Sequence, residues 1–170
     1  MRFLTDNMAD IEKDLIKAET LLAQFEYDKA RKKFNDVIKA DPKNAYAYFG
    51  KAESMVALPK AKVEDIMEAY QKALELDPEN VYYLTTLGSF CSDVGKFNEA
   101  EQFYTKATEI DEENASMYFS EFAISYYLKA PVIMEKFLDD NTRKMIRKKS
   151  LVYLLKALDM DEEEAKELLS

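Results

Sequence analysis

Histidine is absent from this 170-residue chain, and cysteine and glycine are scarce. Without histidine the chain lacks the usual general base and cannot form a Ser–His or Cys–His nucleophile pair. A tetrahedral zinc site is excluded too, because the chain has a single cysteine. Its three glycines form no phosphate-binding loop. The sequence therefore predicts no enzyme, no metal site and no cofactor.

Long apolar segments and an excess of positive charge are also missing. No uncharged apolar run approaches the roughly 18 residues that a membrane helix needs, so we expect no membrane partner. The first residues lack the apolar run of a signal peptide, and one cysteine cannot form an internal disulfide; both features favour the cytoplasm. The net charge of −9 disfavours nucleic acid as a partner, because positive charge supplies most of that affinity.

A helical pattern is clearest over residues 81–114. Apolar and small residues recur there at helical spacing on two faces, which carry Leu84, Leu87 and Cys91, and Ala100, Phe103, Tyr104 and Ala107. Between them, Val94, Gly95 and Lys96 predict a tight turn. Gly88 lies inside the first helix, where glycine is costly, so we expect another backbone to approach it closely. These residues predict a helical hairpin packed through small side chains.

Short segments that end a helical pattern recur along the chain at Asp41, Asp77, Asp111 and Asp161. These aspartates are separated by 36, 34 and 50 residues. A period near 34 residues is the signature of tetratricopeptide repeats, and the chain resembles this family. Residues 81–114 carry the family pattern at Leu84, Leu87, Gly88, Ala100, Tyr104 and Ala107. They depart from it at Cys91, where an aromatic is usual, and at Glu112, where proline is usual.

The resemblance implies an all-α fold, a right-handed superhelical solenoid of antiparallel helix hairpins. We expect a single domain over 1–170, with about four repeats at 11–44, 45–80, 81–114 and 115–161. The fourth repeat is longer than the others, which predicts an inserted helix at about 131–139. A capping helix is expected at about 162–169, with Ala165, Leu168 and Leu169 covering the last hairpin.

Family geometry also implies a concave groove lined by the first helix of each repeat. The predicted partner-binding residues in that groove are Tyr46, Phe49, Glu53, Tyr82, Thr85, Ser89, Phe119, Tyr126 and Tyr127. Aromatic side chains with a polar tip are typical of binding hot spots. We therefore expect the groove to hold an extended segment or an amphipathic helix of a partner. The alternative is that several of these aromatics pack between repeats.

One subtype of the family holds the C-terminal carboxylate of chaperones with Lys and Asn from successive first helices. The corresponding positions here offer no positive charge, since they hold Leu15, Glu19, Gly50, Tyr82 and Thr86. We therefore expect no chaperone carboxylate clamp.

Two runs of basic residues stand out against the acidic composition. The longer run contains Arg143, Lys144, Arg147, Lys148 and Lys149, and the shorter contains Lys29, Arg31, Lys32 and Lys33. The ordinary interpretation of such runs is a solvated helix face. The other is a patch for an acidic partner or for phosphates, at Arg143, Lys144, Arg147 and Lys148, where i, i+4 spacing places pairs on one face.

These features together predict a protein–protein interaction module: an adaptor, a scaffold or an assembly factor that binds another protein or a peptide segment. The alternative is a permanently bound accessory subunit of a larger enzyme complex. A free adaptor should purify as a monomer or a dimer, so a homo-oligomer stays open, whereas an obligate subunit should aggregate alone.

Overall fold

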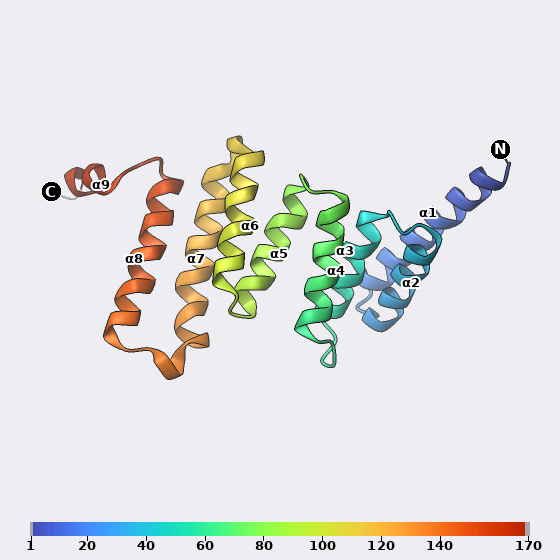
Figure 1. Ribbon diagram of the computed structural model, residues 1–170, viewed down its shortest axis with the longest axis horizontal. Coiled ribbons are helices and arrows are strands. Elements are labelled where there is room, and N and C mark those ends of the chain that lie inside the picture. Colours follow the sequence, from blue (N-terminus) through green and yellow to red (C-terminus); the bar gives the residue numbers. More distant parts are fainter. Residues whose placement is uncertain (1, 169–170) are drawn as a thin grey trace. The chain divides into compact units, whose positions relative to one another are not determined.

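The computed structural model describes residues 2–168, with side chains from Met8 onward, and this part of the chain is helical without a strand. Its helices are α1 (Arg2–Ala23), α2 (Tyr27–Ala40), α3 (Ala45–Val56), α4 (Val63–Leu76), α5 (Val81–Asp93), α6 (Phe97–Ile110), α7 (Ala115–Ile133), α8 (Asp140–Ala157) and α9 (Glu162–Leu168). The pairs α1 with α2, α3 with α4, α5 with α6 and α7 with α8 each form an antiparallel hairpin (Figure 1). The predicted all-α solenoid of helix hairpins is confirmed. The chain divides into two compact units, residues 1–83 and 84–170.

In the first unit, the core forms where α1, α2 and α3 meet, around Ala18, Ala30, Phe34, Val37 and Ala47. Gly50 of α3 admits the ring of Phe34, because a Cβ at Gly50 would lie 2.2 Å from that ring. Asn44 begins α3 by accepting a hydrogen bond from the Ala47 N–H at 2.9 Å. The helix ends at Val56, three residues before Pro59.

In the second unit, α5 and α6 pack through a glycine and an aromatic ring. A Cβ at Gly88 would lie 2.9 Å from the ring of Tyr104. The expectation that another backbone approaches Gly88 is therefore wrong, since an aromatic ring occupies that space. The turn between the helices is where the sequence predicts it, and Gly95 adopts the positive φ of 80° that glycine tolerates best.

The long fourth repeat contains no separate inserted α-helix. Instead, α7 continues through Pro131 to Ile133, and one 3₁₀ turn follows at Glu135–Phe137. Proline lacks an N–H, but near the end of a helix this removes only a single backbone hydrogen bond. Packing compensates for it, because Ala130 shares a buried cluster with Phe97 of α6 and Ile146 of α8, and Met134 and Leu138 pack against this cluster. The helix predicted at about 131–139 is thus replaced by the end of α7 and this turn.

The C-terminal helix α9 is held by local capping more than by burial. Asp161 accepts a hydrogen bond from the Glu164 N–H at 2.9 Å, and Glu164 accepts one from the Asp161 N–H at 2.8 Å. This reciprocal pair is a capping box. Ala165 is half-buried, but Leu168 is 76% exposed and does not cover the last hairpin as predicted. Leu169 lies outside the described residues.

No helix in the described part of the chain combines the length and apolarity needed to cross a membrane.

Candidate functional site

An aromatic surface lies on one side of the first unit. It consists of Tyr46 and Phe49 from α3 with Tyr82 and Tyr83 from the start of α5. The ring of Phe49 is at the centre, with centroid separations of 4.5 Å to Tyr83, 5.2 Å to Tyr82 and 6.5 Å to Tyr46. Asn80 fixes the start of α5 by accepting a hydrogen bond from the Tyr83 N–H at 3.1 Å.

Exposure separates the members of the aromatic surface into two roles. Phe49 is 4% exposed and Tyr83 is 5% exposed, so these two rings form a buried base. Tyr46 is 39% exposed and Tyr82 is 62% exposed. Of the predicted binding residues in this unit, Tyr46 and Tyr82 are exposed to solvent. Phe49 is buried and contacts both of their rings.

Carboxylates border the aromatic surface. Burial raises the pKa of Tyr46 to about 12, and the neighbouring charge of Glu19 adds to the shift. The hydroxyl of Tyr70 donates a hydrogen bond to Glu53 from the adjacent helix α4. Burial, followed by the charge of Glu53, raises the pKa of Tyr70 far above its usual range. The exposed tyrosines therefore lie in an environment that favours positive charge.

The predicted residues on α5 in the second unit are small and half-buried. Thr85 and Ser89 both have intermediate exposure. Ser89 is hydrogen-bonded to Tyr104, whose pKa is raised above its usual range by burial and by its bond to Glu121. The Tyr104 hydroxyl donates to Glu121 at 2.8 Å. Ser89 thus contributes to packing within the unit as well as to its surface.

The predicted aromatics on α7 divide between two faces of that helix. Phe119 packs against Tyr153 of α8 at 6.0 Å, and Tyr126 packs edge-on against Phe97 of α6 at 5.0 Å. Both rings are half-buried. Tyr127, one position further along the helix, is 49% exposed and lies on the face that carries other exposed apolar side chains.

Lysine and tyrosine side chains of α8 converge on one carboxylate in the second unit. Lys149 and Tyr153 both hydrogen-bond to Glu101 of α6. Burial opposes ionisation of Glu101, but the bonds from Lys149 and Tyr153 outweigh it and hold the pKa of Glu101 below its usual value. The Lys149 ammonium also lies 5.3 Å from the centre of the Tyr126 ring. The charge of Lys149, a member of the longer basic run, is therefore neutralised by contacts within the unit.

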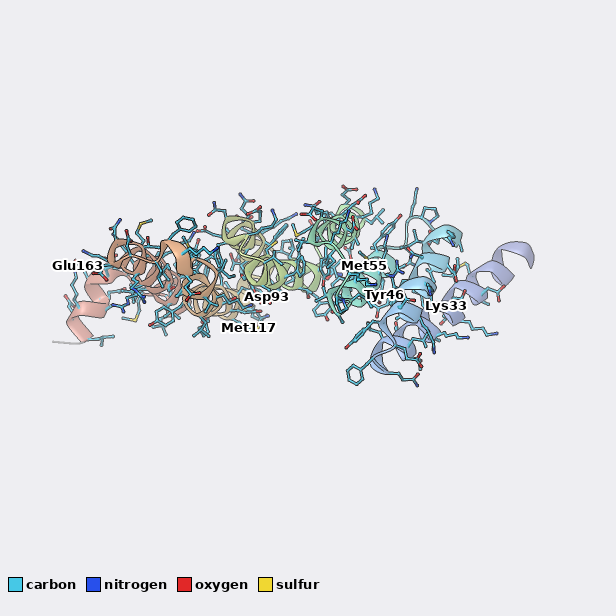
Figure 2. All side chains as sticks on the ribbon, turned by 90° about the horizontal axis from the view of Figure 1, so that it is seen from below. Lys33, Tyr46, Met55, Asp93, Met117 and Glu163 are labelled. Atoms are coloured by element: carbon cyan, nitrogen blue, oxygen red, sulfur yellow. The ribbon has the colours of Figure 1, made fainter. Side chains whose placement is uncertain are left out.

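The two basic runs differ in how their charges are neutralised. In the shorter run on α2, Arg31 and Lys32 pair with Asp28, and Lys33 pairs with Asp14 of α1 at 2.9 Å (Figure 2 labels Lys33). In the longer run on α8, exposed cations without an ion pair to any described residue remain at Arg143, Lys144, Arg147 and Lys148. Of the two runs, the one on α8 therefore presents positive charge that no described acidic residue neutralises.

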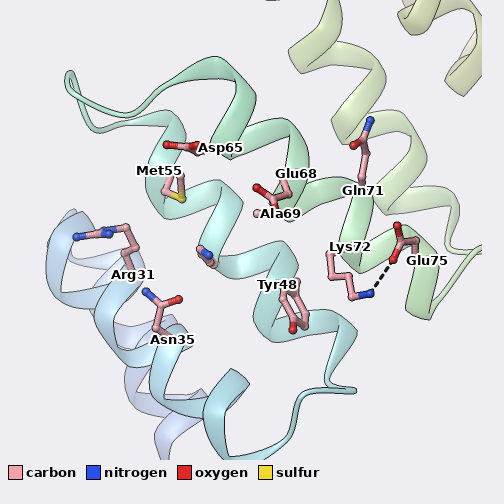
Figure 3. A pocket seen from close by; sticks show the side chains of 11 residues that line it. Arg31, Asn35, Tyr48, Met55, Asp65, Glu68, Ala69, Gln71, Lys72 and Glu75 are labelled. Carbon is pink, nitrogen blue, oxygen red and sulfur yellow. Dashed lines mark hydrogen bonds and ion pairs between the residues drawn. The ribbon is translucent and has the colours of Figure 1, made fainter.

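A polar pocket of about 590 Å³ lies on the other side of the first unit, between α2, α3 and α4 (Figure 3). Tyr48, Lys51 and Met55 line it from the side of α3 opposite to the aromatic surface, as their helical spacing requires. Charges of both signs line its walls, and Lys72 pairs with Glu75 at 2.7 Å. The sequence analysis placed binding residues on the first helix of each repeat. It missed this pocket because the second helices, α2 and α4, supply most of the lining residues.

Comparison with known proteins adds three findings. Residues 69–102 match the family model of the tetratricopeptide repeat. Anaphase-promoting complex subunit 3 of Schizosaccharomyces pombe is 26% identical over 93 residues, which cover 55% of this chain and 14% of that protein. The match thus spans a small part of the relative's length. The crystal structure of MamA has a similar fold, with a TM-score of 0.68 and 19% identity over 97% of this chain and 86% of the MamA chain.

Proposed function

Because this chain is a tetratricopeptide-repeat protein, we propose that it is a protein–protein interaction module, an adaptor, scaffold or assembly factor, that binds a partner segment on its aromatic surface. Repeats of this architecture present extended surfaces on rigid stacked helices. No reaction is proposed. The cytoplasm is the proposed location, in keeping with a buried thiol at Cys91, the one cysteine of the chain.

The observation that carries this proposal is the pairing of exposed tyrosines with a buried aromatic base. Tyr46 and Tyr82 project from two different helices, and Phe49 contacts both rings. Rings held in this way lose little conformational freedom when a partner covers them. Tyrosine is also among the residues enriched in binding hot spots. Tyr46 and Tyr82 are therefore the proposed anchors.

The bordering carboxylates define the chemistry of the partner segment. Glu19 lies beside Tyr46, and Glu53 accepts the hydrogen bond of Tyr70. A segment that places an apolar or aromatic side chain on the tyrosines and a lysine or arginine beside these acids fits the surface. In the second unit, the proposed contacts remain Thr85, Ser89, Phe119 and Tyr126, with Tyr127 as a proposed contact on the other, exposed face of α7.

A second candidate function is that of a permanently bound accessory subunit. The name of the yeast relative describes a subunit of a complex. Exposed apolar side chains on α7 and α8, such as Leu128 at 62% exposed, also fit a surface that is buried in an assembly. The two candidates separate by purification, because an obligate subunit aggregates alone and an adaptor stays monodisperse.

The test of the aromatic surface is partner capture from a lysate of the source organism, with quantitative mass spectrometry. We expect Tyr46→Ala combined with Tyr82→Ala to reduce the captured partner by about tenfold or more, since hot-spot tyrosines contribute at least that much. The matched control is Phe137→Ala, an exposed aromatic at 76% in the second unit. Full capture by a folded double variant would contradict the proposal.

A further inference from the structure

An open apolar groove runs between α7 and α8 on the outer side of the last hairpin. Its walls are Ile124, Tyr127 and Leu128 from α7 and Leu151 and Leu154 from α8. The walls are accessible, with Leu128 at 62% and Leu151 at 52% exposed. The groove has a volume of about 210 Å³, and a second hollow of about 180 Å³ shares Tyr127, Leu128 and Arg147 with it.

Two small, buried residues form the floor of this groove. Ala123 is fully buried, and Ser150 is 3% exposed. The hydroxyl of Ser150 has no hydrogen-bond partner among the described residues. Both side chains are too small and too buried to rise between the walls, so they leave space for an occupant above them. Helix α9 does not fill the groove, since Leu168 remains exposed.

Positive charge borders the apolar walls. Arg147 lines both hollows, and Arg143 lines the second. Neither arginine forms an ion pair with a described residue, although the chain as a whole carries a net charge of −9. Guanidinium groups bind carboxylates through two parallel hydrogen bonds, which makes arginine well suited to an acidic partner.

The shape of the groove favours a helix as its occupant. The lining residues of α8 extend from Arg143 to Leu154, a length of roughly 17 Å, or about three helical turns. Two side-by-side helices form ridges between which a third helix can pack, as each hairpin of a solenoid packs on the next.

We propose that the groove between α7 and α8 binds an acidic amphipathic helix of a partner protein. Its apolar side chains, spaced three or four residues apart, enter between Leu128 and Leu151, and its carboxylates meet Arg143 and Arg147. This site is separate from the aromatic surface and has the opposite charge preference. The chain therefore has two binding surfaces with different partners: a basic segment for the first unit and an acidic helix for the second.

The probes for this site are two designed helical peptides of about 18 residues, or five turns. Both carry the same leucines at i, i+3, i+4 and i+7 spacing, with glutamates on the polar face of one and lysines on the polar face of the other. Binding to the full chain is measured by fluorescence anisotropy. We expect the acidic peptide to bind at least about tenfold more tightly than the basic one, because of the two arginines.

Two double variants locate the binding. Leu128→Glu with Leu151→Glu should lower the affinity for the acidic peptide at least about tenfold, since it places like charge in the groove. Arg143→Glu with Arg147→Glu should reverse the preference between the peptides. The charge-matched control is Lys106→Glu with Lys136→Glu, which changes two exposed lysines that do not line the groove and should leave affinity within about twofold, because exposed charges in water are screened. Circular dichroism confirms that each variant is folded.

Each of the following outcomes would overturn the proposal. The first is equal binding of both peptides, and the second is full binding by the folded groove variant. The third is a wild-type dimer in sedimentation that Leu128→Glu with Leu151→Glu dissociates, which would make the groove a self-interface; a rise in peptide affinity with Leu168→Glu would likewise assign it to α9. The fourth is binding to phosphatidylserine vesicles that the groove variant abolishes, which would assign the face to a lipid surface.

Discussion

The ring of Phe49 stacks on the ring of Tyr83 with a centroid separation of 4.5 Å and 16° between the ring planes. This contact joins α3 to the start of α5 within the first unit. It leaves Phe49 buried, although the helical spacing places it on the same face as the exposed Tyr46. The aromatic surface therefore combines a structural base with accessible rings, and the two kinds of residue should respond differently to substitution.

Phe49→Ala should destabilise the chain by about 3–5 kcal/mol, the usual cost of removing a buried phenylalanine. Tyr82→Ala should cost less than about 1 kcal/mol, because the side chain is 62% exposed. Urea unfolding followed by circular dichroism measures both. Similar losses for the two variants would contradict the division into base and anchor.

Gly88→Ala should destabilise the chain by roughly 1–3 kcal/mol, although alanine is the better helix former. The added Cβ would lie 2.9 Å from the ring of Tyr104, which is buried and held by its bond to Glu121. Thermal unfolding of the variant measures the effect. A gain in stability would show that the ring moves freely and that the glycine has no packing role.

Glu101→Gln should cost about 1 kcal/mol at neutral pH, after allowance for the partial exposure of the carboxylate. Bonds from Lys149 and Tyr153 hold the pKa of Glu101 below its usual value of 4.5 in the folded chain. A depressed folded pKa contributes stability above the unfolded value and loses it as pH falls through the folded value. The difference between wild type and variant should therefore be constant above pH 5, roughly, and shrink below 4.5.

Urea midpoints measured across this acid range test that expectation, with Glu113→Gln as an exposed control. A difference that stays constant down to the acid limit would show that ionised Glu101 does not stabilise the fold.

Cys91 should react slowly with maleimides in the native chain. Burial raises the pKa of this thiol to about 12, so very little thiolate is present at neutral pH. We expect labelling at least about 100-fold slower than in the urea-unfolded chain, because both exposure and thiolate are lacking. Comparable rates in the two states would mean that α5 opens readily.

Helical spacing and the 34-residue period predicted the hairpins, the turn at Gly95 and the buried face of Leu84, Leu87 and Cys91, because these features depend on local pattern. Helical spacing alone could not predict that Phe49 is buried while Tyr46 is exposed. Spacing places Phe49 and Tyr46 on one face of α3, and only the contact with Tyr83 from another helix decides which ring is covered.

The basic runs show the same limit. Their compositions are alike, but Lys33 finds its partner in Asp14, nineteen residues earlier in the chain. Arg143 and Arg147 have no such partner among the described residues, and the apolar groove beside them forms only when α7 packs against α8. Pro131 misled the sequence prediction because proline usually ends a helix, whereas packing on Ile146 carries α7 past it.

Site-specific photo-crosslinking tests the aromatic surface most directly. A photoreactive phenylalanine analogue is placed at Tyr46 or Tyr82 and, as a control, at Tyr48 on the opposite side of α3. Figure 2 labels Tyr46 among the side chains. We expect one partner to crosslink from both Tyr46 and Tyr82 and not from Tyr48. Crosslinking from Tyr48 alone, or from all three positions equally, would contradict binding on the aromatic surface.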